Sequence, residues 1–155
     1  MEQAGLHVHI DSRICRPPGG GDWLGLVQDT VGVIERAARS GVPYALRGLL
    51  LDTDMRGRNN ARDTQARAIS TDYNIHTIWQ EHDHEALLLR HLLGFHSHRP
   101  PPGQSRPALV AQLSSYAKPW DAAQLERVFD IDALHRVIGV EAQLRHFLGL
   151  LGWPP

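Results

Sequence analysis

The chain has 155 residues, of which 42% are hydrophobic and 21% are charged, and its formal net charge at pH 7 is −1. The length fits one domain with a core of ordinary size, and the composition excludes an intrinsically disordered chain. The net charge is too close to zero to indicate nucleic-acid binding by itself.

Cysteine content and hydropathy indicate the compartment. Cys15 is the single cysteine, which excludes an intramolecular disulfide and fits a reducing environment. No apolar run in the sequence is long enough to cross a bilayer, and His7, His9 and Asp11 interrupt the N-terminal segment, unlike a signal peptide. We therefore expect a cytoplasmic protein that does not contact a membrane.

The first expected elements are a strand, a glycine-rich loop and a helix. Residues 6–10 alternate between apolar and polar side chains, which indicates a strand. Residues 16–21 (RPPGGG) form a loop, but no Gly-Lys-Ser/Thr follows, so a phosphate-binding loop is not expected. Asp22 is a typical N-cap for a helix over residues 23–38, and Gly41 marks the end of that helix.

A second strand and helix follow. Residues 45–51 are nearly all apolar, which predicts a strand covered on both faces. Asn59 or Asn60 is expected to cap the next helix, over residues 61–70.

A third pair completes the pattern. Residues 75–79 alternate as a strand does, and residues 86–93 form an apolar helix. Alternating strands and helices predict an α/β fold with a mainly parallel sheet. We expect the strand at residues 45–51 to be central, between strands at residues 6–10 and 75–79.

The sequence changes character after residue 98. A proline-rich connection over residues 99–104 precedes helices only, which are expected at residues 107–116, 122–128, 132–138 and 141–151. We therefore predict an α/β core over residues 1–98 and a helical C-terminal region over residues 99–155 that packs on it.

Two aspartates follow the expected central strand. Asp52 and Asp54 are separated by one residue, and side chains at this spacing point to the same side of a strand. Open α/β sheets bind ligands at the carboxyl ends of their strands, and a divalent cation would relieve the repulsion between two carboxylates. The alternative is that one aspartate caps a helix and the other is solvated.

A second acidic group follows the strand at residues 75–79. Glu81 and Glu85 bound it, and they would meet Asp52 and Asp54 if the two strands are neighbours. Oxygen ligands suit Mg²⁺ or Mn²⁺, so we predict a site made by Asp52, Asp54 and Glu85, with Glu81 as a further ligand.

Zinc is a less expected occupant of this region. His82 and His84 lie within the second acidic group, and imidazole is a common zinc ligand. However, the sequence has no His-Glu-x-x-His motif and no evident third zinc ligand.

Arginine dominates the basic residues. Of the 16 basic residues only Lys118 is a lysine, and arginine suits bidentate contacts with phosphate, although a GC-rich genome produces the same bias. Arg56, Arg58 and Arg62 follow the two aspartates and are candidates for phosphate binding, with a solvated surface as the ordinary alternative.

These motifs resemble a known family. The residues Leu-Leu-Asp-Thr-Asp at positions 50–54 look like the second acidic motif of the TOPRIM fold of topoisomerases, primases and OLD-type nucleases. The order of elements is similar to that of RloB-like proteins, the TOPRIM-type partners of ATPases in restriction and abortive-infection loci. Glu85 before an apolar run and the Tyr116-Ala117-Lys118 sequence also resemble that family, and the resemblance covers roughly residues 6–118.

The resemblance implies a small TOPRIM-like (Rossmannoid) sheet with flanking helices and a C-terminal helical layer. It also implies a Mg²⁺- or Mn²⁺-dependent nuclease or phosphodiesterase of a phage-defence or restriction-associated system. Asp52, Asp54 and Glu85 would then hold the metal, while Arg56, Arg58 and Lys118 would neutralise phosphates. The implied partners are an ATPase, or another defence-system protein, and nucleic acid.

One departure from the family opens an alternative. The first TOPRIM strand normally carries a glutamate followed by glycine, whereas the only acidic strand end upstream of residue 52 is Asp11. Either the start codon is internal, or a partner supplies the strand, or the protein is a degenerate, non-catalytic member. The alternative function is therefore an interaction subunit of the same fold, whose exposed apolar helices dock a larger partner.

Overall fold

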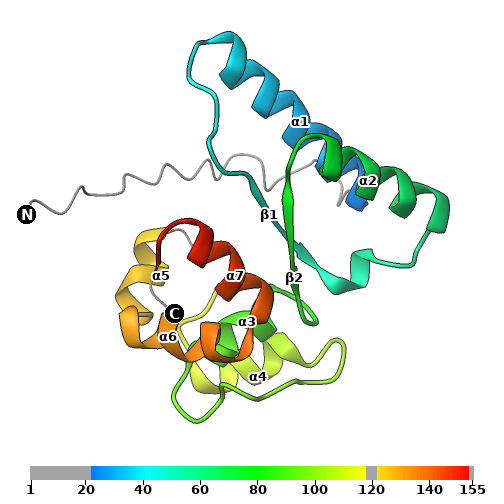
Figure 1. The fold of residues 1–155 in the computed structure, drawn as a ribbon. Helices are drawn as coiled ribbons and strands as arrows, with labels where there is room; N and C mark the ends of the chain where they lie inside the picture. Colours follow the sequence, from blue (N-terminus) through cyan, green and yellow to red (C-terminus); the bar gives the residue numbers. More distant parts are fainter. Residues whose placement is uncertain (1–21, 118–121, 154–155) are drawn as a thin grey trace, which may run out of the picture. The chain divides into compact units, whose positions relative to one another are not determined.

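The computed structural model describes residues 22–117 and 122–153 (Figure 1). These residues form a mixed α/β structure, as predicted, although a TOPRIM-like arrangement stays a prediction. The elements, in chain order, are α1 (Trp23–Arg39), β1 (Gly48–Asp52), the short 3₁₀ helix η2 (Thr53–Met55), α2 (Asn60–Asp72), β2 (His76–Gln80), α3 (His84–His91), α4 (Ser105–Gln112), α5 (Ala122–Val128), α6 (Ile131–Val140) and α7 (Ala142–Leu150).

The described residues pack into two compact units. The first unit contains residues 22–49, 55–77 and 148–153, and the second contains residues 50–54, 78–117 and 122–147. α3 and α4, which lie on either side of residue 98, belong to the same unit and pack together, and the predicted division into residues 1–98 and 99–155 stays a prediction.

β1 and β2 are hydrogen-bonded neighbours in a parallel sheet, which is two-stranded within the described residues. This confirms the predicted pairing of the segments at residues 45–51 and 75–79. The strand expected at residues 6–10 lies outside the described residues, so its place beside β1 stays a prediction.

The burial of β1 differs from the expectation. Leu49 and Leu51 are buried, whereas Leu50 between them is 46% exposed. The prediction that both faces are covered is therefore wrong for the strand as described. A run of three leucines hides the ordinary two-residue alternation of a strand, because its outward position is as apolar as its inward ones.

Side-chain caps explain where several helices begin. Asp22 accepts a hydrogen bond from the N–H of Gly25 at 2.9 Å, and Asn59 accepts one from Arg62 at 3.2 Å, which confirms both predicted caps. Asp83 caps α3 and Asp130 caps α6 in the same way. α3 therefore begins two residues earlier than the apolar pattern alone predicts.

α4 ends earlier than expected. The helix predicted at residues 107–116 covers Ser105–Gln112, and a turn follows at Ser114 and Ser115. Serine side chains compete with the backbone for hydrogen bonds and so favour turns over helix interiors. Tyr116 consequently lies beyond the helix, where it joins the core of the second unit.

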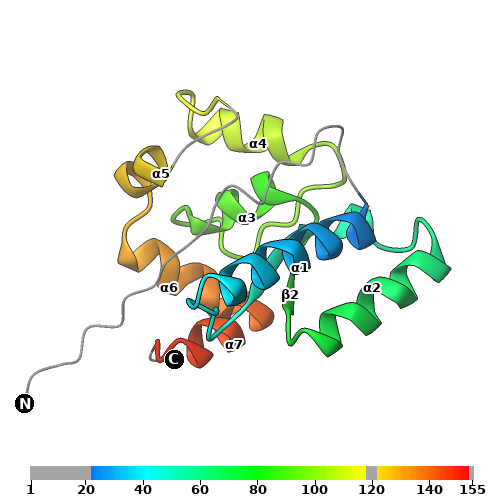
Figure 2. The same cartoon turned by 90° about the horizontal axis from the view of Figure 1, so that it is seen from above.

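The first unit is built on the contact between α1 and α2, which run side by side in both views (Figure 2). Their junction is completed by a hydrogen bond from the Tyr73 hydroxyl to Glu35 at 2.8 Å and by an ion pair between Arg62 and Asp22. The buried apolar side chains of this unit are Trp23, Leu24, Leu26, Val27, Ile34, Leu49, Ala66 and Ile75.

The core of the second unit lies where α3 packs against α4 and α6. Leu88, Leu89, Leu109 and Tyr116 form its buried cluster. Partly buried apolar side chains pack around that cluster, namely Leu92, Phe95, Ala108, Leu113, Leu125 and Phe129. In the part of the chain that is described, no helix has the length and apolar character needed to cross a membrane.

Candidate functional site

The carboxyl ends of the two strands meet, as the sequence predicts. Thr53 follows β1, and its N–H and its Oγ1 hydroxyl both donate to the carbonyl oxygen of His82, at 3.2 and 3.1 Å. His82 follows β2, so these bonds join the segment with Asp52 and Asp54 to the second acidic group.

The two aspartates do not share a regular strand. Asp52 is the last residue of β1 and is partly buried, whereas Asp54 is exposed and belongs to η2. The expectation that both side chains point to one side relies on strand alternation, which ends at Asp52. The 3₁₀ helix begins at Thr53, and two hydrogen bonds hold that residue to His82.

Glu85 lies in the core of the second unit. It is in the first turn of α3, only 6% exposed, and its carboxylate accepts a hydrogen bond from the Tyr116 hydroxyl. Burial of Tyr116, together with the negative charge and hydrogen bond of Glu85, raises the pKa of the Tyr116 phenol to about 12, against an opposing effect of Arg106. In the sequence, only the Tyr-x-Lys resemblance marks this tyrosine as a candidate, and that resemblance does not predict its contact with Glu85.

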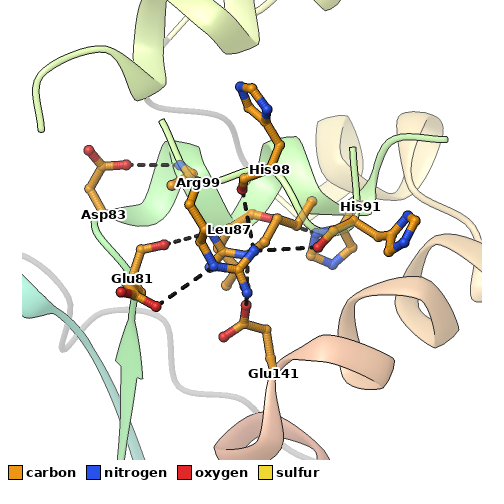
Figure 3. A network of polar contacts seen from close by, with 10 residues as sticks. Glu81, Asp83, Leu87, His91, His98, Arg99 and Glu141 are labelled. Carbon is orange, nitrogen blue, oxygen red and sulfur yellow. Dashed lines mark hydrogen bonds and ion pairs between the residues drawn. The ribbon is translucent and has the colours of Figure 1, made fainter. Parts of the chain in front are cut away.

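The other acidic residues after β2 also have structural contacts (Figure 3). Asp83 is the cap of α3, accepting a hydrogen bond from Ala86 N at 2.8 Å. The Glu81 carboxylate lies 3.7 Å from Nε of Arg99, and the Glu81 carbonyl oxygen accepts a 2.6 Å hydrogen bond from Arg90. Each of these groups therefore stabilises the turn that leads from β2 into α3.

Within the described residues, no group of three histidine, cysteine, aspartate or glutamate side chains is arranged to hold a metal ion. The predicted convergence of Asp52, Asp54 and Glu85 on one cation is thus not found there. Mg²⁺ and Mn²⁺ require several oxygens around one point, so binding of either ion at these residues stays a prediction, as does the less expected zinc binding.

The candidate phosphate-binding residues are differently placed. Arg62 makes two contacts with the Asp22 carboxylate, the second at 3.0 Å, and this pairing is the main cause that lowers the Asp22 pKa to about 2. Arg56 and Arg58 are exposed in the first unit, on either side of Gly57, whose N–H bonds to Asp63 at 2.7 Å. Lys118 lies outside the described residues.

The ion pair between Arg90 and Glu141 is not predicted by the sequence. Arg90 is fully buried on α3, with its Nε 2.6 Å from Oε1 of Glu141, the residue before α7. The same carboxylate oxygen lies 2.9 Å from Nη2 of Arg99 (Figure 3). Burial lowers the pKa of Arg90 and the Glu141 charge opposes that effect. The available signal in the sequence is an arginine directly after the apolar run at residues 86–89, in a segment for which only an apolar helix is predicted.

Comparison with known proteins does not assign the chain to a family. No family model matches the chain, and neither the curated proteins nor the solved structures that were compared with it gave a match. The resemblance to RloB-like and other TOPRIM proteins therefore stays a prediction.

Proposed function

We propose that this chain is a non-catalytic interaction subunit that docks a larger protein, with the ATPase of a defence locus as the expected partner. The proposal is carried by the exposure of two large apolar side chains in the second unit. Leu93 is 82% exposed and Ile131 is 50% exposed. Single exposed leucines are common in soluble proteins, so the placement of these two side chains matters more than their number.

Leu93 and Ile131 each follow, two residues later, a residue of one ring contact. The ring of His91 lies 5.0 Å from the ring of Phe129, centroid to centroid. Leu93 is two residues after His91, and Ile131 is two residues after Phe129, so both follow directly from segments that touch. We call Leu93 and Ile131 the apolar pair. Exposed apolar side chains next to a packed junction are candidates for a docking surface.

The acidic residues support the same proposal. Asp83 and Glu81 stabilise the turn before α3, and Glu85 is buried against Tyr116. These contacts give the carboxylates a role in stability that does not require catalysis. The acidic residues in the sequence are therefore compatible with a protein that docks a partner and has no catalytic activity.

The test uses a matched pair of substitutions. Leu93→Glu puts a charge on the apolar pair, and Val42→Glu makes the same change at a 72% exposed apolar residue of the first unit. Each variant is mixed with the purified product of the neighbouring gene, and the dissociation constant is measured by biolayer interferometry. We expect Leu93→Glu to weaken binding at least tenfold, which corresponds to about 1.4 kcal/mol, and Val42→Glu to leave it unchanged. Equal affinities for the wild type and Leu93→Glu would contradict docking through the apolar pair.

A metal-dependent phosphodiesterase remains the second candidate, because the Thr53 hydrogen bonds join the two acidic segments. We derive no reaction step for this candidate, since no group of three potential metal ligands is found among the described residues. Mn²⁺-dependent cleavage of plasmid and single-stranded DNA by the purified chain distinguishes the two functions. Cleavage that Asp52→Asn abolishes would favour the enzyme, and no cleavage with or without the partner would favour the interaction subunit.

A further inference from the structure

We propose that His91 makes the junction between α3 and α6 sensitive to pH, so that protonation of its imidazole loosens the packing of α6 on α3. The proposal is independent of what the protein binds. It follows from the contacts of one residue with three parts of the second unit, and from the charges that face it.

The imidazole of His91 is held on two sides. Its Nδ1 lies 3.0 Å from the carbonyl oxygen of Leu87, one turn earlier in α3 (Figure 3). A carbonyl can only accept, so Nδ1 carries the hydrogen, and the neutral ring takes an added proton on Nε2. The ring face is tilted by 48° against Phe129, which lies between α5 and α6.

The backbone of His91 is held by α6 itself. Nε of Arg136 donates a 2.9 Å hydrogen bond to the carbonyl oxygen of His91. This bond satisfies a carbonyl in the last turn of α3, where helical partners run out. A shift of His91 is therefore transmitted to Phe129 through the ring and to α6 through Arg136.

The surroundings disfavour a positive charge on the ring. Burial is the largest cause that lowers the His91 pKa, and the positive groups that face it are Arg90 and His84 from α3 and Arg136 from α6. The hydrogen bond to the Leu87 carbonyl acts in the opposite direction and raises the pKa. The net direction is a lowered pKa, so the folded chain prefers the neutral imidazole.

The sign of the pH effect follows from this direction. A histidine whose pKa is lower in the folded state than its ordinary 6.5 stabilises the fold fully above pH 6.5. The unfolded chain takes up the proton first as pH falls, so stability is lost from pH 6.5 downward, until the folded form also titrates. One such group changes the unfolding equilibrium constant by at most about tenfold per pH unit.

The experiment compares urea unfolding of the full chain at pH 7.5 and pH 5.5. His91→Asn removes the titration and keeps an amide N–H for the Leu87 carbonyl, while His135→Asn, at an exposed position of α6, is the matched control. We expect the wild type and His135→Asn to lose more stability at pH 5.5 than His91→Asn. An equal loss in His91→Asn and in the wild type would overturn the proposal.

A second measurement decides the question even if His91→Asn does not fold. The wild-type imidazole is titrated by NMR, and amide exchange of α6 is followed at both pH values after correction for intrinsic rates. We expect His91 to titrate below pH 6.5, and α6 amides to exchange several-fold faster at pH 5.5 relative to those of α1. A titration midpoint at or above pH 6.5, or unchanged α6 protection across that midpoint, would contradict the proposal.

Discussion

Thr53 donates two hydrogen bonds to one acceptor, the carbonyl oxygen of His82, through its N–H and its Oγ1 hydroxyl. These bonds connect the segments that follow β1 and β2, and they bring the two acidic stretches of the sequence to the same end of the sheet. The hydroxyl bond depends on a side chain, which makes its contribution measurable.

Replacing Thr53 with valine should destabilise the chain modestly. Valine has nearly the shape of threonine but cannot donate to His82, and a net hydrogen bond contributes about 0.5–1.5 kcal/mol. Urea unfolding of Thr53→Val should show a loss of that size, whereas Thr53→Ser keeps the hydroxyl and should lose less. A Thr53→Val variant as stable as the wild type, with the loss confined to Thr53→Ser, would show that the methyl group, and not the hydrogen bond, is what matters.

Replacing Tyr116 with phenylalanine should cost more, because Glu85 is buried and loses the donor of its hydrogen bond. A buried acceptor left without its partner costs about 1–3 kcal/mol. Tyr44→Phe, at a partly exposed tyrosine in the first unit, provides the control in urea unfolding. If Tyr116→Phe is as stable as the wild type, Glu85 does not depend on this hydroxyl.

The same tyrosine predicts an alkaline transition. Its folded pKa of about 12 lies above the ordinary 10.0, so the folded state keeps a proton that the unfolded chain loses. Stability should therefore be full below pH 10 and decline as pH rises from 10 toward 12. Tyrosinate absorbance should show one of the chain's three tyrosines titrating last, and that step should vanish in Tyr116→Phe. Titration of Tyr116 itself near pH 10 would contradict its burial.

Asp22 predicts an acidic transition of the opposite kind. The Arg62 pairing and the Gly25 N–H hold its pKa at about 2, below the ordinary 3.8, so this stabilisation is present above pH 3.8 and is lost as pH falls toward 2. Asp22→Asn keeps a capping side chain without the charge, and Asp22→Ala also removes the cap, which is worth about 1 kcal/mol. Unfolding at pH 7 should rank the wild type above Asp22→Asn, and Asp22→Asn above Asp22→Ala. An alanine variant as stable as the asparagine variant would show that the cap contributes nothing.

Removing the charge of Glu141 should have the largest effect. Arg90 is fully buried, and a buried charge that loses its partner costs about 3–5 kcal/mol. Glu141→Gln should lower the melting temperature strongly, whereas Glu126→Gln, at an exposed position of α5, should leave it unchanged. A melting temperature of Glu141→Gln close to that of the wild type would show that the ion pair contributes little.

Local sequence patterns predicted the helices and strands better than the side-chain contacts of the candidate site. The caps Asp22 and Asn59, and the pairing of the two described strands, follow from periodicity and from side chains that bond their own neighbourhood. The burial of Glu85 against Tyr116 was not predictable in this way, because it depends on where α4 ends and on packing across 31 positions. The Arg90–Glu141 pair spans an even longer separation, and nothing local marks Glu141 as its partner.

The central question is whether the acidic residues near the Thr53–His82 contact stabilise the fold or hold a metal ion. The most direct measurement is calorimetric titration of Mn²⁺ into the wild-type chain, Asp52→Asn and Glu85→Gln. If these acidic residues stabilise the fold, we expect no saturable heat of binding at micromolar Mn²⁺ for the wild type or for either variant. We also expect a lower unfolding temperature for Glu85→Gln. Stoichiometric Mn²⁺ binding by the wild type that both substitutions abolish would contradict this account.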